Sequence, residues 1–78
     1  METVTYHRIE IRCGDHHFSL FCTQKSLEYR REEILLWADK LARRLHWQTY
    51  ETTISSASVR EANERPHALF EHRFPTPP

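Results

Sequence analysis

Apolar and polar residues alternate in two neighbouring segments, residues 8–13 and residues 17–22. Alternation with a period of two is typical of β-strands that bury one face and expose the other. The pattern therefore predicts two strands whose apolar side chains share one face of a sheet. The side chains on that face are Ile9, Ile11, Cys13, Phe18, Leu20 and Cys22.

A turn between these strands is indicated by Gly14, the only glycine in the chain, and by Asp15. A two-residue turn would place Ile11 opposite Phe18, whereas a four-residue loop would place Ile11 opposite Leu20. Both registers keep the apolar side chains on one face. A hairpin is therefore predicted, and its register stays open between these two alternatives.

Residues 27–46 repeat their apolar positions with the period of a helix and contain no glycine or proline. Ser26 is a suitable N-cap residue. Acidic residues occupy the first turns and basic residues the last turn, which matches the helix dipole at both ends. One long helix is predicted, with one face packed on the apolar side of the hairpin. That face carries Leu27, Ile34, Trp37, Ala38, Leu41 and Leu45, with Leu35 and Ala42 at its margin.

A second group of large side chains, Tyr29, Leu36 and Trp47, projects from the opposite side of the same helix, flanked by Lys40 and Arg43. Two interpretations are open. In one, the C-terminal segment covers these side chains, or the helix ends before Trp47 and its ring turns inward. In the other, the five residues form an exposed aromatic and basic patch of the kind found at interface hot spots. The second interpretation makes them the candidate partner-binding site.

The second half of the chain carries weaker patterns. Residues 48–56 are rich in threonine and alternate, and residues 67–74 alternate again, so each segment predicts a strand. Residues 58–65 are compatible with a loop or a short helix. The predicted fold is α+β, an antiparallel sheet in the order of elements ββαββ with the helix packed on one face. A single domain is expected over residues 1–74, followed by a proline-rich flexible tail at residues 75–78.

Length and charge exclude several classes of protein. The 78 residues are enough for one core, and the 11 basic and 11 acidic side chains cancel. No overall field therefore drives the protein onto nucleic acid or an anionic membrane. No apolar run approaches the roughly 18 residues that span a bilayer, and the first residues lack the layout of a signal peptide. We expect a cytoplasmic protein with no membrane partner.

Zinc is suggested by the run of Cys13, His16, His17 and Cys22, because sulfur and imidazole are its preferred ligands. The predicted ladder argues against this site. It separates the two cysteines by four to six positions, roughly 13–20 Å at about 3.3 Å per residue. Neither one metal ion nor a disulfide can bridge that distance. We expect free thiols, no metal and no cofactor.

Catalytic motifs are lacking in the sequence: there is no phosphate-binding glycine loop, nucleophile elbow, metalloprotease motif or paired-carboxylate motif. We therefore expect no enzymatic activity. The favoured hypothesis is a small protein-interaction module, an inhibitor or regulator that binds a larger protein partner or forms a homodimer. Its size and style are common among phage and mobile-element proteins, although no motif supports that likeness.

The alternative hypothesis is a small nucleic-acid-binding protein. Arg8, Arg12 and His17 lie on the outer face of the predicted hairpin, and Phe21 on the same face could stack on a base. Glu10 in the middle of this patch and the neutral total charge count against the hypothesis.

Overall fold

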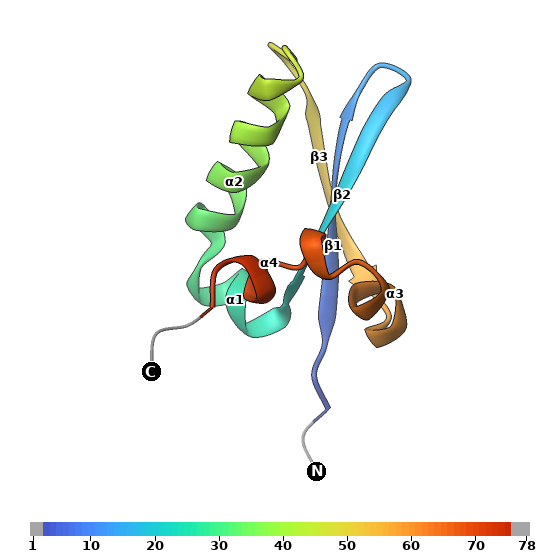
Figure 1. The fold of residues 1–78 in the computed structure, drawn as a ribbon, viewed down its shortest axis with the longest axis vertical. Coiled ribbons are helices and arrows are strands. Elements are labelled where there is room, and N and C mark those ends of the chain that lie inside the picture. The colour runs from blue at the N-terminus through green and yellow to red at the C-terminus, as the bar shows by residue number, and fades with distance from the viewer. Residues whose placement is uncertain (1–2, 76–78) are drawn as a thin grey trace.

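The protein forms a three-stranded antiparallel sheet with helices on both faces, in a computed structural model that describes residues 3–75 (Figure 1). The strands are β1 (Tyr6–Cys13), β2 (His16–Thr23) and β3 (Glu51–Ala57), and their order in the sheet is β2-β1-β3. The longest helix, α2 (Arg31–Arg44), lies along one face of this sheet. The predicted α+β class with a helix on an antiparallel sheet is confirmed.

The hairpin has the shorter of its two predicted turns. Ile11 lies opposite Phe18, and Gly14 and Asp15 form the turn. Gly14 has a φ of +62°, which matches the first position of a type II′ turn and is a conformation that side chains with a Cβ rarely adopt. The single glycine of the chain therefore fixes the register of the hairpin.

The predicted long helix is divided into α1 (Gln24–Tyr29) and α2. Thr23, and not Ser26, is the N-cap of α1, because its hydroxyl accepts a hydrogen bond from the Ser26 N–H at 3.2 Å. The two helices are separated at Arg30, where φ is −129° and ψ is 30°. The chain enters α1 directly from β2, so a change of direction at Arg30 is needed before α2 can run along the sheet. No glycine or proline marks this break.

The core lies between the hairpin and the inner face of α2, and the predicted helix face is mostly correct. Ile34, Trp37, Ala38 and Ala42 are buried, whereas Leu45 is 51% exposed. Leu45 lies outside the core because α2 ends at Arg44, so its side chain no longer follows the helical stripe. The sheet contributes Ile9, Ile11, Leu20 and Cys22 to this core, whereas Phe21 is buried on the opposite face of the sheet.

The prediction of a strand over residues 67–74 is wrong. The structure has the helix α3 (Val59–Glu64), the 3₁₀ helix η1 (Pro66–Ala68) and the short helix α4 (Phe70–Arg73). Among the described residues, this part of the chain forms one isolated β-bridge with the sheet, between Leu69 and Phe21. Ser58 caps α3 through its hydroxyl, so the segment that was compatible with loop or helix is a helix.

The spacing of the phenylalanines in residues 67–74 explains why this segment can form helical turns in place of the predicted strand. Phe70 and Phe74 are four residues apart, which suits one face of a helical turn as well as one face of a strand. Both rings pack beside Trp37, with centroid distances of 6.0 Å and 5.5 Å. Pro66 also favours the start of a helical turn, since it has no N–H to give to a strand.

Helices α2 and α3 lie on opposite faces of the sheet (Figure 1). Ala62 of α3 is fully buried, and Glu61 of the same helix lies 3.6 Å from Arg8 on β1. None of the helices within residues 3–75 is both long and apolar enough to cross a membrane. The predicted tail lies outside the described residues from residue 76 onward.

Candidate partner-binding site

The structure distributes the five residues predicted to bind a partner over α1, α2 and the segment after α2. Tyr29 lies on α1 and is 77% exposed. Leu36, Lys40 and Arg43 lie on α2 at spacings of four and three residues, so they share one face of that helix. The break at Arg30 separates Tyr29 from this face, and the end of α2 at Arg44 separates Trp47 from it.

Trp47 turns inward, as one of the two interpretations of the sequence expected. The end of α2 is a Schellman motif, in which the Trp47 N–H donates to the Ala42 carbonyl and the His46 N–H donates to the Arg43 carbonyl, both at 3.0 Å. His46 has the positive φ of 61° that this motif needs. The reversal brings the Trp47 ring onto Phe18, with 5.4 Å between the centroids.

Arg43 is already engaged within the chain. Its Nε donates to one carboxylate oxygen of Asp39 at 2.7 Å, and the Tyr50 hydroxyl donates to the other at 2.6 Å. The bond from Tyr50, and then that from Arg43, lowers the pKa of Asp39, and the same carboxylate raises the pKa of Tyr50. These contacts tie α2 to the residue that precedes β3.

The outer hairpin face predicted for nucleic acid is mostly covered or paired. Phe21 is 3% exposed, so it cannot stack on a base in this structure. Arg8 is half-buried beside Glu61, and the Arg12 guanidinium lies 2.7 Å from Glu10. His17 alone among the four predicted residues is exposed and engaged in no ion pair within the described part of the chain.

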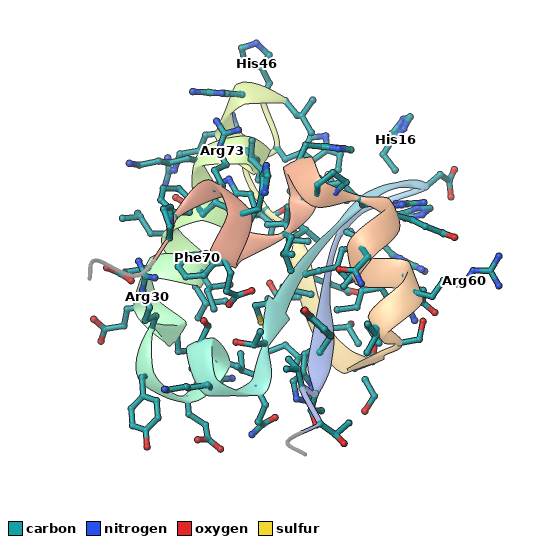
Figure 2. All side chains as sticks on the ribbon, turned by 60° about the horizontal axis from the view of Figure 1, so that its bottom comes forward. His16, Arg30, His46, Arg60, Phe70 and Arg73 are labelled. Carbon is teal, nitrogen blue, oxygen red and sulfur yellow. The ribbon has the colours of Figure 1, made fainter. Side chains whose placement is uncertain are left out.

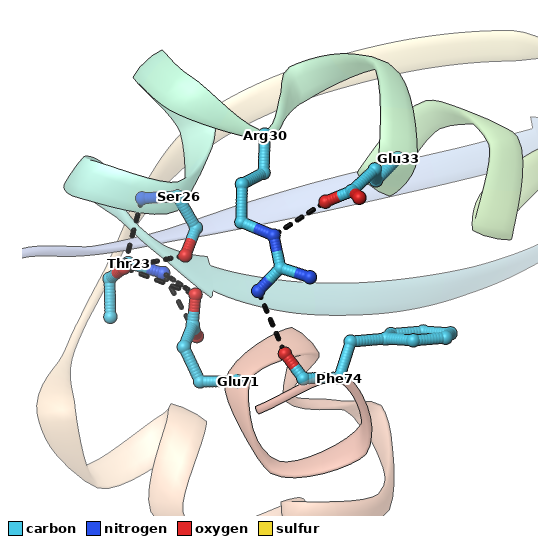
Figure 3. A network of polar contacts seen from close by, with 6 residues as sticks. All are labelled: Thr23, Ser26, Arg30, Glu33, Glu71 and Phe74. Carbon is cyan, nitrogen blue, oxygen red and sulfur yellow. Dashed lines mark hydrogen bonds and ion pairs between the residues drawn. The ribbon is translucent and has the colours of Figure 1, made fainter. Parts of the chain in front are cut away.

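Residues 66–74, which we call the C-terminal strap, cover the outer edge of β2 from Phe21 to Thr23. We call this part of the edge its closed half. The Thr23 N–H donates to both carboxylate oxygens of Glu71 at 3.2 Å, and the Thr23 hydroxyl lies 3.1 Å from one of them (Figure 3). Leu69 forms a β-bridge with Phe21, two residues before Thr23 on the same strand. Strap and strand are therefore joined by backbone and side-chain contacts.

Arg30 holds the strap from the other side. Its guanidinium donates to the Phe74 carbonyl at 2.8 Å and stacks over the Phe70 ring, 4.6 Å from the centroid. A contact with Glu33 orients the same guanidinium (Figure 3). Phe70 is the fully buried side chain of the strap and packs beside Trp37 of α2, with Arg30 next to it (Figure 2).

The upper half of the same edge, His16–Leu20, has no such cover, and we call it the open edge. Residues that flank a two-residue turn form a hydrogen-bonded pair, which here is Cys13 with His16. By the alternation along the strand, the backbone groups of His17, Ser19 and Thr23 point away from β1. Those of Thr23 meet the strap, whereas no backbone group among residues 3–75 bonds to His17 or Ser19 from outside the hairpin.

A groove of about 630 Å³ runs beside the open edge. One wall is α2, and the other is the stretch from the end of α3 to α4. Apolar and basic side chains line it, and no acidic side chain is among them. The lining residues are His17, Phe18, Ser19, Leu20, Trp37, Leu41, Arg44, Leu45, Arg65, His67, Ala68 and Arg73.

Sequence reasoning missed this groove because two of its basic residues belong to segments predicted separately: Arg65 to a loop or short helix, and Arg73 to a strand. The available signal was the charge of the segment: residues 65–73 contain four basic or histidine side chains and a single acid, Glu71. The fold brings that segment beside β2.

The cysteines are separated by the observed register. Cys13 lies opposite His16, six positions along β2 from Cys22, and both are free thiols. Burial, and secondarily the charge of Glu71, raises the pKa of Cys22 to about 12, which suppresses the thiolate. Within residues 3–75 no group of three or more His, Cys, Asp and Glu side chains is arranged to hold a metal ion.

Comparisons with protein-family models, with curated proteins and with solved structures found no significant match to this chain.

Proposed function

We propose that this protein is a non-enzymatic interaction module that takes up an extended segment of a larger protein along the open edge of β2. The observation that carries the proposal is the pair of outward-facing residues, His17 and Ser19, beside a groove of about 630 Å³; no backbone group among residues 3–75 bonds to their outward backbone groups. Addition of a strand to an exposed sheet edge is a recurrent mode of peptide recognition.

Two features of the groove suit a strand. The open edge spans about 13 Å from His16 to Leu20 at about 3.3 Å per residue, and it offers donors and acceptors in alternation. Trp37 and Leu41 of α2 stand beside it and provide an apolar surface for side chains of the added segment. Main-chain bonds would supply affinity, and this surface would supply selectivity.

A role without catalysis is supported by the environment of the Cys22 thiol. Cys22 is wholly buried and its pKa is raised to about 12, the opposite of what a reactive thiolate needs. The module would act as an inhibitor or regulator by occupying a segment of its partner. We place it in the cytoplasm, where thiols such as Cys13 and Cys22 stay reduced.

Selection from a displayed library of random peptides of about twelve residues tests the proposal. We expect bound peptides to slow amide exchange at His17 and Ser19. Ser19→Pro removes an outward N–H without breaking a bond to β1, and it should abolish binding with the fold retained by circular dichroism.

Ser56→Pro is the matched control, because Ser56 faces outward on the opposite edge of the sheet, on β3. This variant should bind the selected peptides as well as the unaltered protein does. A library that yields no binder, or binders that protect β3 or the Leu36 and Lys40 surface, would overturn the proposal.

A further inference from the structure

The charged side chains that line the groove beside the open edge are all basic. Arg44, Arg65 and Arg73 line the groove, are exposed, and take part in no ion pair within residues 3–75. Most other arginines of the chain are paired with an acid, so these three are unlike the general surface. Because the chain has no net charge, the groove is a local concentration of positive charge.

The cationic side chains stand on both sides of β2. Arg44 and Arg73 lie on the side of α2, where they also line an adjoining pocket with Lys40. Arg65 follows α3, the helix on the opposite face of the sheet. The His17 side chain is on that same face, because it alternates with the inward-facing Phe18.

Most of the apolar lining lies on the α2 side, and Ala68 of η1 is a further apolar lining residue. Trp37, Leu41 and Leu45 belong to α2 or its end, and Leu20 shares the face of the sheet on which α2 packs. An added strand shows successive side chains to opposite faces of the sheet. Its apolar residues would therefore meet α2, and the residues between them would meet Arg65 and His17.

We infer, on the basis of the proposed function, that the segment bound at the open edge is an acidic peptide in which apolar and acidic residues alternate. The apolar side chains pack against Trp37 and Leu41. The acidic side chains pair with Arg65, and acids at the ends of the segment reach Arg44 and Arg73.

A second copy of this chain fits the groove less well. Two open edges brought together would oppose three arginines with three arginines. The other edge, β3, carries one acidic residue, Glu51, among its seven. A nucleic-acid strand supplies phosphate acceptors for the arginines, yet it offers no regular donors to the carbonyls of His17 and Ser19.

Fluorescence anisotropy with labelled synthetic peptides tests the inference. The probe is an alternating Val-Glu peptide of about ten residues, and its twin has Gln at each Glu position. We expect the Val-Glu peptide to bind at least about tenfold more tightly at low salt, and we expect the difference to shrink as salt is added.

Charge reversal at the groove supplies the second measurement. Arg65→Glu combined with Arg73→Glu should weaken binding of the Val-Glu peptide by about tenfold or more and should leave binding of the Val-Gln peptide nearly unchanged. Arg31→Glu is the matched control, because Arg31 is exposed and does not line the groove. This control should bind both peptides as the unaltered protein does.

The outcomes separate the two proposals. If both peptides bind equally and Ser19→Pro abolishes both, strand addition stands and the inference of an acidic partner is overturned. If neither peptide binds, both proposals are overturned. An oligothymidylate of about ten nucleotides serves as a third probe; tight, salt-sensitive binding of it alone would overturn both in favour of a nucleic-acid partner.

Discussion

The two halves of the outer edge of β2 have the same backbone geometry and opposite surroundings. At Thr23 the outward N–H is bonded to Glu71, and at Phe21 the strand is bridged by Leu69. At Ser19 and His17 the equivalent groups have no backbone partner within residues 3–75, and three arginines line the neighbouring groove. An edge is therefore open or closed according to what a distant segment packs on it, and the strand sequence itself does not decide the matter.

The largest difference between the halves should appear in amide hydrogen exchange. We expect Thr23, Phe18 and Leu20 to be protected and His17 and Ser19 to exchange at least about a hundredfold faster, because only the latter two lack a partner. NMR in dilute solution measures this. Equal protection of Ser19 and Leu20 would show that something else covers the open edge, and loss of that protection on dilution would identify a second copy.

Replacement of Phe70 should open the closed half. Phe70→Ala removes a fully buried ring packed on Trp37 and Arg30, and it should cost about 3–5 kcal/mol of unfolding free energy. Phe74→Ala is the control: that side chain is 38% exposed, so its loss should cost only about 1–2 kcal/mol. Urea unfolding compares them, and equal effects would mean that Phe70 is not the anchor of the strap.

Loss of the Glu71 charge should loosen the strap by a smaller amount. Glu71→Gln weakens the bonds from Thr23 and should cost about 1 kcal/mol, with faster exchange at the Thr23 amide. Glu64→Gln serves for comparison, because Glu64 has only an exposed pair with Arg60 and should change stability by less than about 0.5 kcal/mol. If the Thr23 amide exchanges at the same rate in Glu71→Gln as in the unaltered protein, this contact does not protect the closed half of the edge.

The smallest expected effect on the free energy of unfolding at neutral pH is that of the Cys22 thiol, which lies in the closed half. In the unfolded chain the thiol ionises near its ordinary pKa of 9.0, whereas in the folded protein it holds its proton to about 12. Below pH 9 both states are protonated, and between pH 9 and about 12 stability should fall, because the unfolded chain binds fewer protons.

Cys22→Ala should lack that fall of stability with pH. In the unaltered protein a thiol reagent at about pH 8 should modify Cys13, which is only partly buried, and leave the fully buried Cys22 unmodified until the chain unfolds. Rapid labelling of both thiols in the folded protein would mean that the strap does not shield β2.

The hairpin and the inner face of α2 were predictable because their apolar periods are set locally. Ile9 and Ile11 alternate with polar neighbours, and Trp37 and Ala38 fall on one helical stripe. The strap was not predictable in this way. Its main contact joins Thr23 to a residue 48 positions away, and its two phenylalanines suit a strand and a helical turn equally.

The candidate site was harder to foresee than the fold. Trp47 was placed on the wrong side of α2 in one interpretation because the helix end at His46 has a positive φ without a glycine to announce it. The groove combines α2, β2 and the segment after α3, so no single stretch of sequence contains it. Only the excess of basic residues near the strap pointed toward it.

The strap also has a consequence for the order of folding. The hairpin and α2 use contacts that are closer together in the chain, so they can assemble before residues 66–74 have docked. During synthesis the strap leaves the ribosome after everything that it covers. Until it arrives, Phe21 and the whole length of β2 are available to other unfinished chains, and that interval is when the protein is most prone to aggregate.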